Sequence, residues 1–468
     1  MAINIPRLPA LDYFEFPAMC QLMKRVPFLF TFACAGLFLM SACGGEWTPG
    51  ATASRAVAPK IPAATPLDDN NRTAEAGARF LEDRVKHDPE DFSAHNKLAA
   101  YYLQRARETG SFDYLDLAAR AAKASLASVP SIRNAGGLAA LAQTEYATHD
   151  FAAARDHARQ LIQLDPAKSY PYAILGDALL ELGDYDGAVG AYQQVQRIDG
   201  GISNGSETRQ ARLAFLRGDT NAATRHFSTA LIVALNAVAP SRETVAWCRW
   251  QLGEVAFATG DYQQAEKHYR DALVTFPDYY RALASLARVR AAQNDLAGAI
   301  ENYRQAIKRL PDPSFIAALG DLYKVAGKER EAMQQYTQVE QIARLSAISG
   351  ALYNRQLALF YADHELKAAE AYEAAMREYE VRRDIYGADA LAWTAFKAGH
   401  LAEAQAKIKE ALRLGTKDAR LFYHAGMIAK AAGDERGAKQ WLEKALQLNP
   451  QFDPLLSLSA RHALLQSS

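Results

Sequence analysis

One stretch of the sequence, Gly201-Ile202-Ser203-Asn204-Gly205, matches the G-x-S-x-G pattern of serine nucleophiles in acyl transfer. In that chemistry the serine sits on a sharp turn between a strand and a helix, which exposes its hydroxyl to the substrate. Here the preceding residues, 186–198, have the apolar spacing of a helix rather than of a strand. We therefore predict a loop between two helices and no nucleophilic role for Ser203.

Metal and phosphate chemistry finds no better support in the sequence. His364-Glu365 lacks the second histidine that a zinc-binding H-E-x-x-H helix needs. The ten histidines are scattered, without nearby cysteines or a consistent carboxylate, and there is no glycine-rich phosphate loop. The sequence thus predicts no catalytic residue, no metal site and no cofactor.

The cysteines also argue against covalent chemistry in the folded part. Cys248, between Trp247 and Trp250, would be a nucleophile if its thiol were accessible and ionised. Free cysteine is among the most buried residue types, so we predict a core residue instead. A disulfide framework is excluded there, because the other cysteines lie near the N-terminus; the four are Cys20, Cys34, Cys43 and Cys248.

The charge balance bears on the class of partner. The chain has 53 lysines and arginines and 53 aspartates and glutamates, so its net charge is zero. Nucleic-acid binding relies on a basic surplus that neutralises phosphates. We therefore expect no nucleic acid as partner and, without a catalytic site, no small-molecule substrate.

Residues 1–42 have the layout of a bacterial secretory signal. Lys24 and Arg25 precede an apolar run over residues 26–40, which is short for a membrane-spanning helix of about 20 residues. The run ends in Met40-Ser41-Ala42-Cys43, which resembles the lipobox of bacterial lipoproteins. That resemblance implies lipidation of Cys43 and attachment to the membrane through this lipid. With Gly44 rather than aspartate next, it also implies the outer membrane, facing the periplasm.

Two further features of the N-terminal region follow from composition. Asp12 and Glu15 are atypical for the start of a signal, which favours Met23 as the true first residue. Residues 43–72 link the lipidated cysteine to the rest of the chain. Their content of alanine, proline, glycine and threonine cannot bury enough apolar surface to fold. We predict a flexible tether that spans roughly 30 Å.

From residue 73 onward the sequence repeats itself. The pattern that includes Ala265, Tyr269 and Pro277 recurs 34 residues later at Ala299, Tyr303 and Pro311. One small residue per repeat can be followed along the chain, at Ala118, Ala154, Ala188, Ala223, Ala265, Ala299, Ala332, Ala368, Ala404 and Ala438. This period and pattern resemble the tetratricopeptide repeat (TPR), in which each unit is a pair of helices.

The resemblance implies an all-α TPR solenoid, about ten helix-turn-helix repeats in a right-handed superhelix over residues 73–451. A capping helix is expected over residues 452–468. Glycines such as Gly253 would let the first helix of a pair approach the second closely, and tyrosines such as Tyr269 would fill the wedge between them. Gly-Asp pairs such as Gly260-Asp261 would end the first helix and cap the second.

The resemblance also implies that first helices line the concave face. Large aromatic residues mixed with arginines and acids are typical of protein-binding surfaces, although each aromatic residue could instead pack between helices. We expect the groove, which would hold envelope proteins or peptides, to include Tyr170, Asp177, Arg212, Trp247, Trp250, Glu254, Arg281, Arg288, Asp321, Tyr353 and Trp393.

Three functions are compatible with this sequence. Stretches such as 102–110, 388–393 and 414–418 resemble secreted bacterial TPR proteins of unassigned biochemical role, which supports a non-enzymatic scaffold or adaptor in the cell envelope. The alternative is a pilotin-like assembly factor for secretion, pili or exopolysaccharide export. A third reading, the repeat region of an enzyme such as a glycosyltransferase, requires a catalytic domain, whereas the expected repeats and capping helix occupy all of residues 73–468.

Overall fold

A computed structural model describes residues 58–67, 71–349 and 354–466 of the chain. The chain divides into a unit of residues 1–56 and a unit of residues 57–468, and the described residues all belong to the second. The expected signal region and Cys43 therefore lie outside the described residues and stay predictions.

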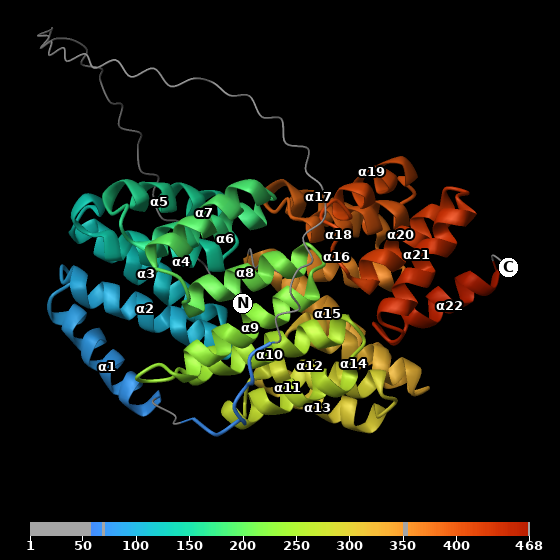
Figure 1. The fold of residues 1–468 in the computed structure, drawn as a ribbon, viewed down its shortest axis with the longest axis horizontal. Coiled ribbons are helices and arrows are strands. Elements are labelled where there is room, and N and C mark those ends of the chain that lie inside the picture. The colour runs from blue at the N-terminus through green and yellow to red at the C-terminus, as the bar shows by residue number, and fades with distance from the viewer. Residues whose placement is uncertain (1–57, 68–70, 350–353, 467–468) are drawn as a thin grey trace, which may run out of the picture. The chain divides into compact units, whose positions relative to one another are not determined.

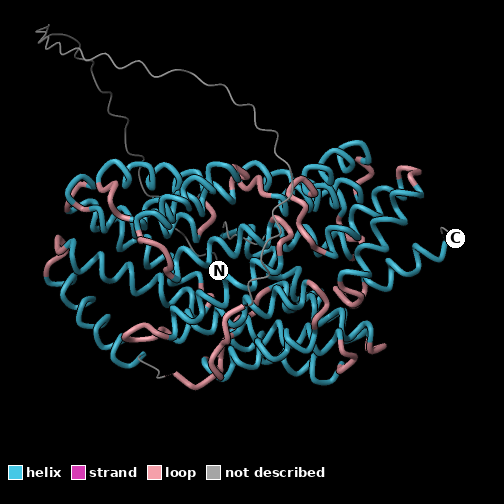
Figure 2. Tube along the Cα trace, in the orientation of Figure 1, coloured by secondary structure: helices cyan, strands magenta, loops and turns pink. Residues whose placement is uncertain are grey.

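The described residues form 22 α-helices and no strand (Figures 1 and 2). The first eleven are α1 (Asn71–His87), α2 (Phe92–Thr109), α3 (Phe112–Ser128), α4 (Ala135–Ala147), α5 (Phe151–Leu164), α6 (Ser169–Glu181), α7 (Tyr185–Ile198), α8 (Asn204–Leu216), α9 (Thr220–Leu235), α10 (Arg242–Ala258) and α11 (Tyr262–Thr275), with a short 3-10 helix η1 (Ser131–Arg133) before α4. The others are α12 (Tyr280–Ala292), α13 (Leu296–Arg309), α14 (Pro313–Val325), α15 (Glu329–Ser349), α16 (Asn354–Asp363), α17 (Ala368–Val381), α18 (Ile385–Lys397), α19 (Leu401–Ala411), α20 (Ala419–Ala431), α21 (Glu435–Leu448) and α22 (Leu456–Gln466).

The helices are arranged in consecutive packed pairs. Ten pairs run from α2 with α3 to α20 with α21, while α1 precedes them and α22 follows them. Leu456 and Ala460 of α22 pack against the α20–α21 cluster, so this helix covers the last repeat. The predicted all-α solenoid of about ten helix pairs with a closing helix is confirmed.

Most second helices begin with the same cap. Gly183 adopts a φ of 78°, a left-handed conformation that favours glycine, just after α6 ends. The carboxylate of Asp184 then accepts a hydrogen bond at 2.9 Å from the backbone N–H of Gly187 in α7. The same aspartate cap starts other second helices, at Asp150, Asp219, Asp261, Asp295 and Asp434.

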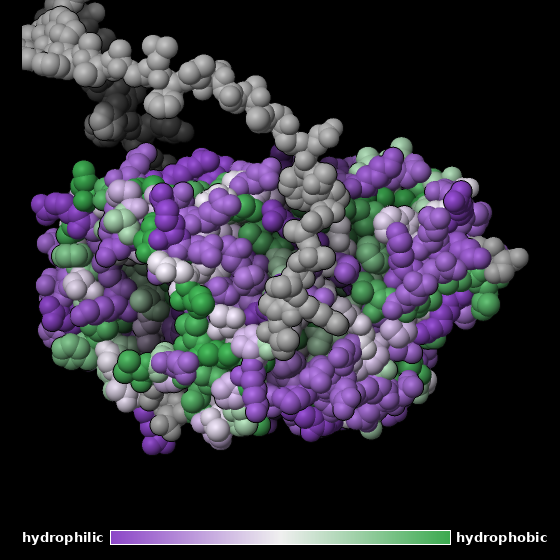
Figure 3. Space-filling view, in the orientation of Figure 1, coloured by the Kyte–Doolittle hydropathy of each residue, from purple (hydrophilic) through white to green (hydrophobic). Residues whose placement is uncertain are grey.

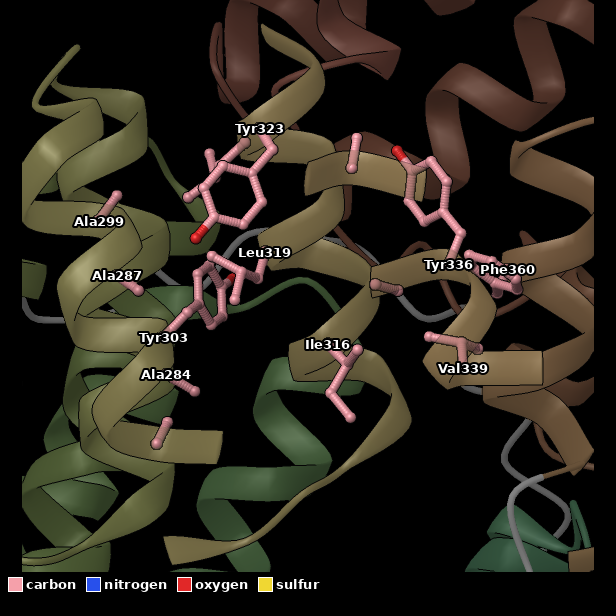
Figure 4. Packing of buried hydrophobic residues seen from close by; sticks show 14 of the residues in the cluster. Ala284, Ala287, Ala299, Tyr303, Ile316, Leu319, Tyr323, Tyr336, Val339 and Phe360 are labelled. Carbon is pink, nitrogen blue, oxygen red and sulfur yellow. The ribbon is translucent and has the colours of Figure 1, made fainter. Parts of the chain in front are cut away.

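Close packing within each pair depends on small residues. A Cβ atom placed on Gly253 would lie 2.3 Å from the ring of Tyr269, so only glycine lets α10 approach α11 this closely. In the next repeats, Figure 4 shows Tyr303 and Tyr323 filling the space beside Ala287 and Ala299, which are both fully buried. Large and small side chains therefore interlock along the core.

The eighth repeat departs from the predicted register. The spacing predicts Ala368 as its small contact residue, but Ala368 is only half-buried whereas Ala371 is fully buried. In most other repeats the contact alanine stands four residues after the N-cap, as Ala188 does after Asp184, whereas Ala118 of the first repeat follows a longer start of its helix. Because the N-cap of α17 is Lys367, the same rule selects Ala371. This assignment was therefore wrong by three residues.

Part of the expected tether lies against the repeats. Ile61 and Leu67 pack against the cluster formed by α8, α9 and α10. The buried guanidinium of Arg249 in α10 donates a hydrogen bond of 3.3 Å to the carbonyl oxygen of Pro62. Residues 58–67 thus differ from the free chain that their composition predicts, because two apolar side chains and one carbonyl find partners on the solenoid.

Repeats far apart in the sequence are also in direct contact. The backbone N–H of Ile385 donates a hydrogen bond of 2.8 Å to the hydroxyl of Tyr185, 200 residues away. The side-chain amide of Asn449 donates to the carbonyl oxygen of Phe257 at 2.7 Å, across 192 residues. Early and late repeats are therefore joined by side-chain contacts as well as through the intervening chain.

Within the described residues, none of the helices is both long enough and apolar enough to cross a bilayer.

Candidate functional site

Two of the cavities in the described part of the chain lie among several first helices at once. Cavity 1, of about 900 Å³, is lined mainly by α2, α4, α6, α8, α12 and α14. Cavity 2, of about 650 Å³, is lined mainly by α10, α12, α14 and α20 with the loop of residues 449–454. All of these are first helices of their pairs, so the cavities lie on the face that the repeat pattern assigns to the inside. The face drawn in Figure 3 is mainly hydrophilic, with smaller hydrophobic patches.

Paired charges form the polar wall of cavity 1. Asp177 accepts hydrogen bonds from Arg209, at 2.5 and 3.0 Å, and from the hydroxyl of Tyr192, at 2.8 Å. Glu181 is only 2% exposed and binds the guanidinium groups of both Arg212 and Arg382. Burial alone would raise the pKa of Glu181, but the two arginines outweigh it and hold the pKa at about 2.

A similar network stands in cavity 2. Glu254 accepts hydrogen bonds from Tyr269 at 2.7 Å, from Ser285 at 2.8 Å and from Arg288 at 2.7 Å. Burial acts to raise the pKa of Glu254, but the charge of Arg288 and these hydrogen bonds hold it below its ordinary value. The indole N–H of Trp250 donates to the same Ser285 at 2.9 Å, which fixes the ring at the cavity wall.

His364 is held in a structural role beside Asp321, which lines cavity 2. One ring nitrogen lies 2.7 Å from Asp321, which also accepts a 2.7 Å hydrogen bond from Tyr336. The other nitrogen lies 2.7 Å from the carbonyl oxygen of Phe360. Burial opposes protonation, but the hydrogen bond and charge of Asp321 outweigh it and raise the pKa of His364. Both nitrogens are engaged within the fold.

The residues that could have carried covalent chemistry also have structural roles. Ser203 is the N-cap of α8, and its hydroxyl accepts a 3.0 Å hydrogen bond from the backbone N–H of Ser206. The first three residues of the motif lie in the predicted loop between α7 and α8, and its last two begin α8. Cys248 is fully buried, and burial raises the pKa of its thiol to about 12, so a thiolate is disfavoured. Its predicted place in the core is confirmed.

No group of three histidine, cysteine, aspartate or glutamate side chains with metal-binding geometry occurs in the described residues. The cavities instead hold neutralised ion pairs beside aromatic rings. Such a lining can form hydrogen bonds and stacking contacts with a bound chain, and its charges are already oriented.

Comparison with known families matches the tetratricopeptide repeat at several positions of the chain. The matched segments are residues 139–201, 205–274, 251–312 and 419–452. They coincide with α4–α7, α8–α11, α10–α13 and α20–α21, four stretches of the helix-pair array described above.

The described helix pairs form a tetratricopeptide-repeat (TPR) solenoid.

A curated relative and several solved structures resemble this TPR protein. The probable biofilm formation methyltransferase WspC of Pseudomonas putida is 47% identical over 60 residues, which is 13% of this chain and 13% of that protein. The type IV pilus biogenesis factor PilW is 18% identical, with a TM-score of 0.37, over 44% of this chain and 91% of that one. The Cut9–Hcn1 hetero-tetramer of the APC/C gives 12% identity and a TM-score of 0.40, over 85% of this chain and 91% of that one.

The repeats make the TPR protein a protein–protein interaction scaffold. Its cavities contain most of the residues that the sequence predicts for the groove. Tyr170 and Asp177 line cavity 1, Arg281 lines both cavities, and cavity 2 is lined by Trp250, Glu254, Arg288 and Asp321. Tyr353 lies outside the described residues.

Three other predicted groove residues do not line either cavity. Trp393 is 1% exposed, because its indole N–H donates to Asp363 at 2.8 Å and its ring stacks on His424 at 4.2 Å. It fills the core between α18 and α20 and is not available to a ligand. Trp247 packs edge-on against Phe227 in the α9–α10 core. Arg212 is taken up by Glu181, in the ion pair described above.

Sequence reasoning missed several cavity residues. Tyr280 lines cavity 1 and stands next to Arg281 on α12. Its position beside a predicted groove residue is the signal that could have identified it. Arg382 and Asp453 follow second helices, in connections where the repeat pattern predicts no inward residue. They reach the cavities only because late repeats lie against early ones, and no local pattern marks such a contact.

Proposed function

We propose that this protein binds extended segments of partner proteins in its two cavities and acts as a non-enzymatic scaffold or adaptor. The observation that carries the proposal is the cavity lining, in which consecutive first helices present aromatic rings next to oriented ion pairs. Aromatic and arginine side chains provide much of the binding energy at protein interfaces. A peptide that lies across several repeats would contact them in series.

The non-enzymatic part of the proposal rests on how the candidate groups are engaged. Ser203 caps a helix, the Cys248 thiol is buried, and both ring nitrogens of His364 are bound to other groups. None of the three presents a free nucleophile or base to either cavity. Turnover of a substrate by the purified mature chain would contradict this part.

We further propose that the scaffold is attached to the bacterial outer membrane by a lipid on Cys43. The support is the lipobox-like ending of the signal region, since Cys43 follows two small residues and precedes Gly44. Metabolic labelling with a palmitate analogue should mark the parent protein in the membrane fraction. Cys43→Ala should lose the label and leave that fraction, and an unchanged label would contradict the anchor.

Site-specific photo-cross-linking in intact cells tests where partners bind. A photoreactive amino acid at Trp250, in cavity 2, or at Tyr170, in cavity 1, should form cross-links to envelope proteins. The same amino acid at Met333, which is 58% exposed and lines neither cavity, is the matched control. Cross-links to the same proteins from Met333, and none from the cavities, would move the site to the outer face.

The same experiment separates the two envelope roles. Cross-linked partners that belong to one secretion, pilus or exopolysaccharide export machine would identify an assembly factor. Partners from unrelated complexes would identify a general adaptor. Both roles use the same cavities. The identity of the partners therefore decides the pathway, and the proposed binding site is the same in either case.

A further inference from the structure

One cationic side chain in the cavities differs from the others. Four cavity arginines form ion pairs, Arg209 with Asp177, Arg288 with Glu254, Arg382 with Glu181 and Arg420 with Asp453. Arg281 is half-buried, yet among the described residues no carboxylate lies within ion-pairing distance of it. Arg107 also lines cavity 1, but it is exposed to solvent.

Aromatic rings hold the Arg281 guanidinium in place. Its central carbon lies 5.4 Å from the ring centre of Trp250 and 5.0 Å from that of Tyr280. The charges of Glu243 and Asp312 act on it from beyond ion-pairing distance. Aromatic rings therefore support the guanidinium of Arg281. Its N–H groups donate no hydrogen bond to any carboxylate among the described residues.

The position of Arg281 relates it to both cavities. Arg281, Ser314 and Phe315 line cavity 1 and also cavity 2, so the two cavities meet at these three side chains. A ligand that reaches Arg281 has open space on either side of it. The end of a chain would fill one side, whereas an internal segment of a chain fills both.

We infer that Arg281 recognises an aspartate or glutamate side chain in an extended partner segment that runs from cavity 1 into cavity 2. The inference rests on the proposed function and names the chemistry of the partner. A guanidinium presents two parallel N–H donors to a carboxylate, and such a bidentate pair is both strong and directional. The rings of Trp250 and Tyr280 exclude water from the pair and strengthen it. The acidic residue thus fixes the register of the segment in the cavities.

Peptide selection with charge reversal tests this inference. A phage-displayed library of random dodecapeptides, fused through their C-termini, is panned on the full mature chain. The parent should enrich peptides with aspartate or glutamate at one fixed position. Arg281→Glu should instead enrich lysine or arginine there, and Arg281→Gln should show no charge preference. Arg377→Glu, on an arginine that is 67% exposed and lines neither cavity, should select the parental peptides.

A double-mutant cycle on one selected peptide measures the contact directly. Glutamine in place of its acidic residue should weaken binding to the parent on the order of 10- to 100-fold, as for a hydrogen bond to a charged group. Binding to Arg281→Gln should then be insensitive to that change. Circular dichroism checks that each variant stays folded, and Arg281→Gln, which keeps most of the side-chain volume, stands in if Arg281→Glu unfolds.

The outcomes distinguish the inference from the proposed function. Enriched peptides without a fixed acidic position, or with one that Arg281→Glu retains, overturn the inference and leave the cavities as a peptide site. Binding only to peptides with a free C-terminal carboxylate, displayed in the opposite orientation, also overturns it, because a chain end is then the ligand. If neither library is enriched and no cavity position cross-links to a protein, the proposed function itself fails.

Discussion

At the scale of single residues, alanine determines how closely the two helices of a repeat can pack. The contact alanines of the repeats, such as Ala188, Ala299 and Ala404, are fully buried. Each faces the first helix of its own pair, where a larger side chain would need space that the packed core does not contain. The eighth repeat provides a direct test, because the spacing predicts Ala368 as its contact residue whereas the structure buries Ala371.

We predict that Ala371→Leu destabilises the protein by about 1–3 kcal/mol, the usual cost of overpacking. Ala368→Leu, three residues earlier in the same helix and only half-buried, should change the unfolding midpoint little. Thermal unfolding followed by circular dichroism compares the two variants. If Ala368→Leu were the less stable variant, Ala368 would be the contact residue, as the spacing predicts, and the helix start at Ala368 would be contradicted.

The sequence predicts the alanines better than the binding residues. An alanine and the tyrosine that packs near it belong to one helix pair, so a local period locates them. Trp393 shows the difference, because tryptophan suits a core and an interface equally, and the repeat phase cannot tell which one surrounds it. Its burial depends on His424 and Asp363, which lie in neighbouring repeats.

At the scale of elements, residues 58–67 behave as an additional element of the fold. They form no helix, yet Ile61 and Leu67 pack on the α8–α10 cluster and Arg249 binds the Pro62 carbonyl. Composition could not predict this contact, since proline and alanine favour a tether and the receiving surface lies far along the sequence.

We predict that Ile61→Ala together with Leu67→Ala releases this segment. Each substitution removes about 1 kcal/mol of apolar burial, since each side chain is half-buried, and one backbone hydrogen bond from Arg249 would not hold the segment alone. Limited proteolysis should become faster within residues 61–67, because a released segment fits a protease active site more readily. Cleavage within α12 and α13 should not change.

Ile202→Ala is the control for general loss of apolar surface, because Ile202 is 70% exposed. It should leave the rate of cleavage within residues 61–67 unchanged. Equal cleavage rates in the parent and the double variant would show that Ile61 and Leu67 do not hold the segment.

At the scale of the whole molecule, direct contacts between distant repeats add to the nearest-neighbour stability of a solenoid. Repeat arrays are stabilised mainly by neighbours, so a local defect affects the adjacent repeats. Here Glu181 and Arg382, 201 residues apart, form a buried ion pair that connects the third repeat to the end of the eighth. Loss of the Glu181 carboxylate should therefore destabilise the eighth repeat directly, although this repeat is not adjacent to the third.

The sequence predicts the period, the number of helix pairs and the closing helix of this molecule. It does not predict the contacts between distant repeats, because these depend on small rotations from each repeat to the next that accumulate along the array. Arg382 illustrates the limit. It stands just after α17, in a connection that carries no repeat signature. Its distant partners are Glu181 and the face of Phe151, and it also lies 3.7 Å from the nearby carboxylate of Asp384.

The Glu181 pair also makes a pH-dependent contribution to stability. The pKa of Glu181 is held at about 2 in the folded protein, against an ordinary value of 4.5. A carboxyl whose pKa is lowered by folding stabilises the fold above its ordinary pKa. That contribution is lost as the pH falls from about 4.5 towards about 2, because the folded protein must then take up the proton that the unfolded chain already holds.

We therefore predict that Glu181→Gln lowers the free energy of unfolding at neutral pH, on the order of 3 kcal/mol, because it leaves two arginines without their buried partner. The difference from the parent should narrow as the pH is lowered from about 4.5 to about 2. Hydrogen exchange should rise in α6 and α8 and also in α17 and α18. Glu254→Gln, which breaks the pair between the neighbouring α10 and α12, is the matched control and should raise exchange only around those helices. If Glu181→Gln leaves hydrogen exchange in α17 and α18 unchanged, the Glu181–Arg382 contact does not stabilise the distant repeats.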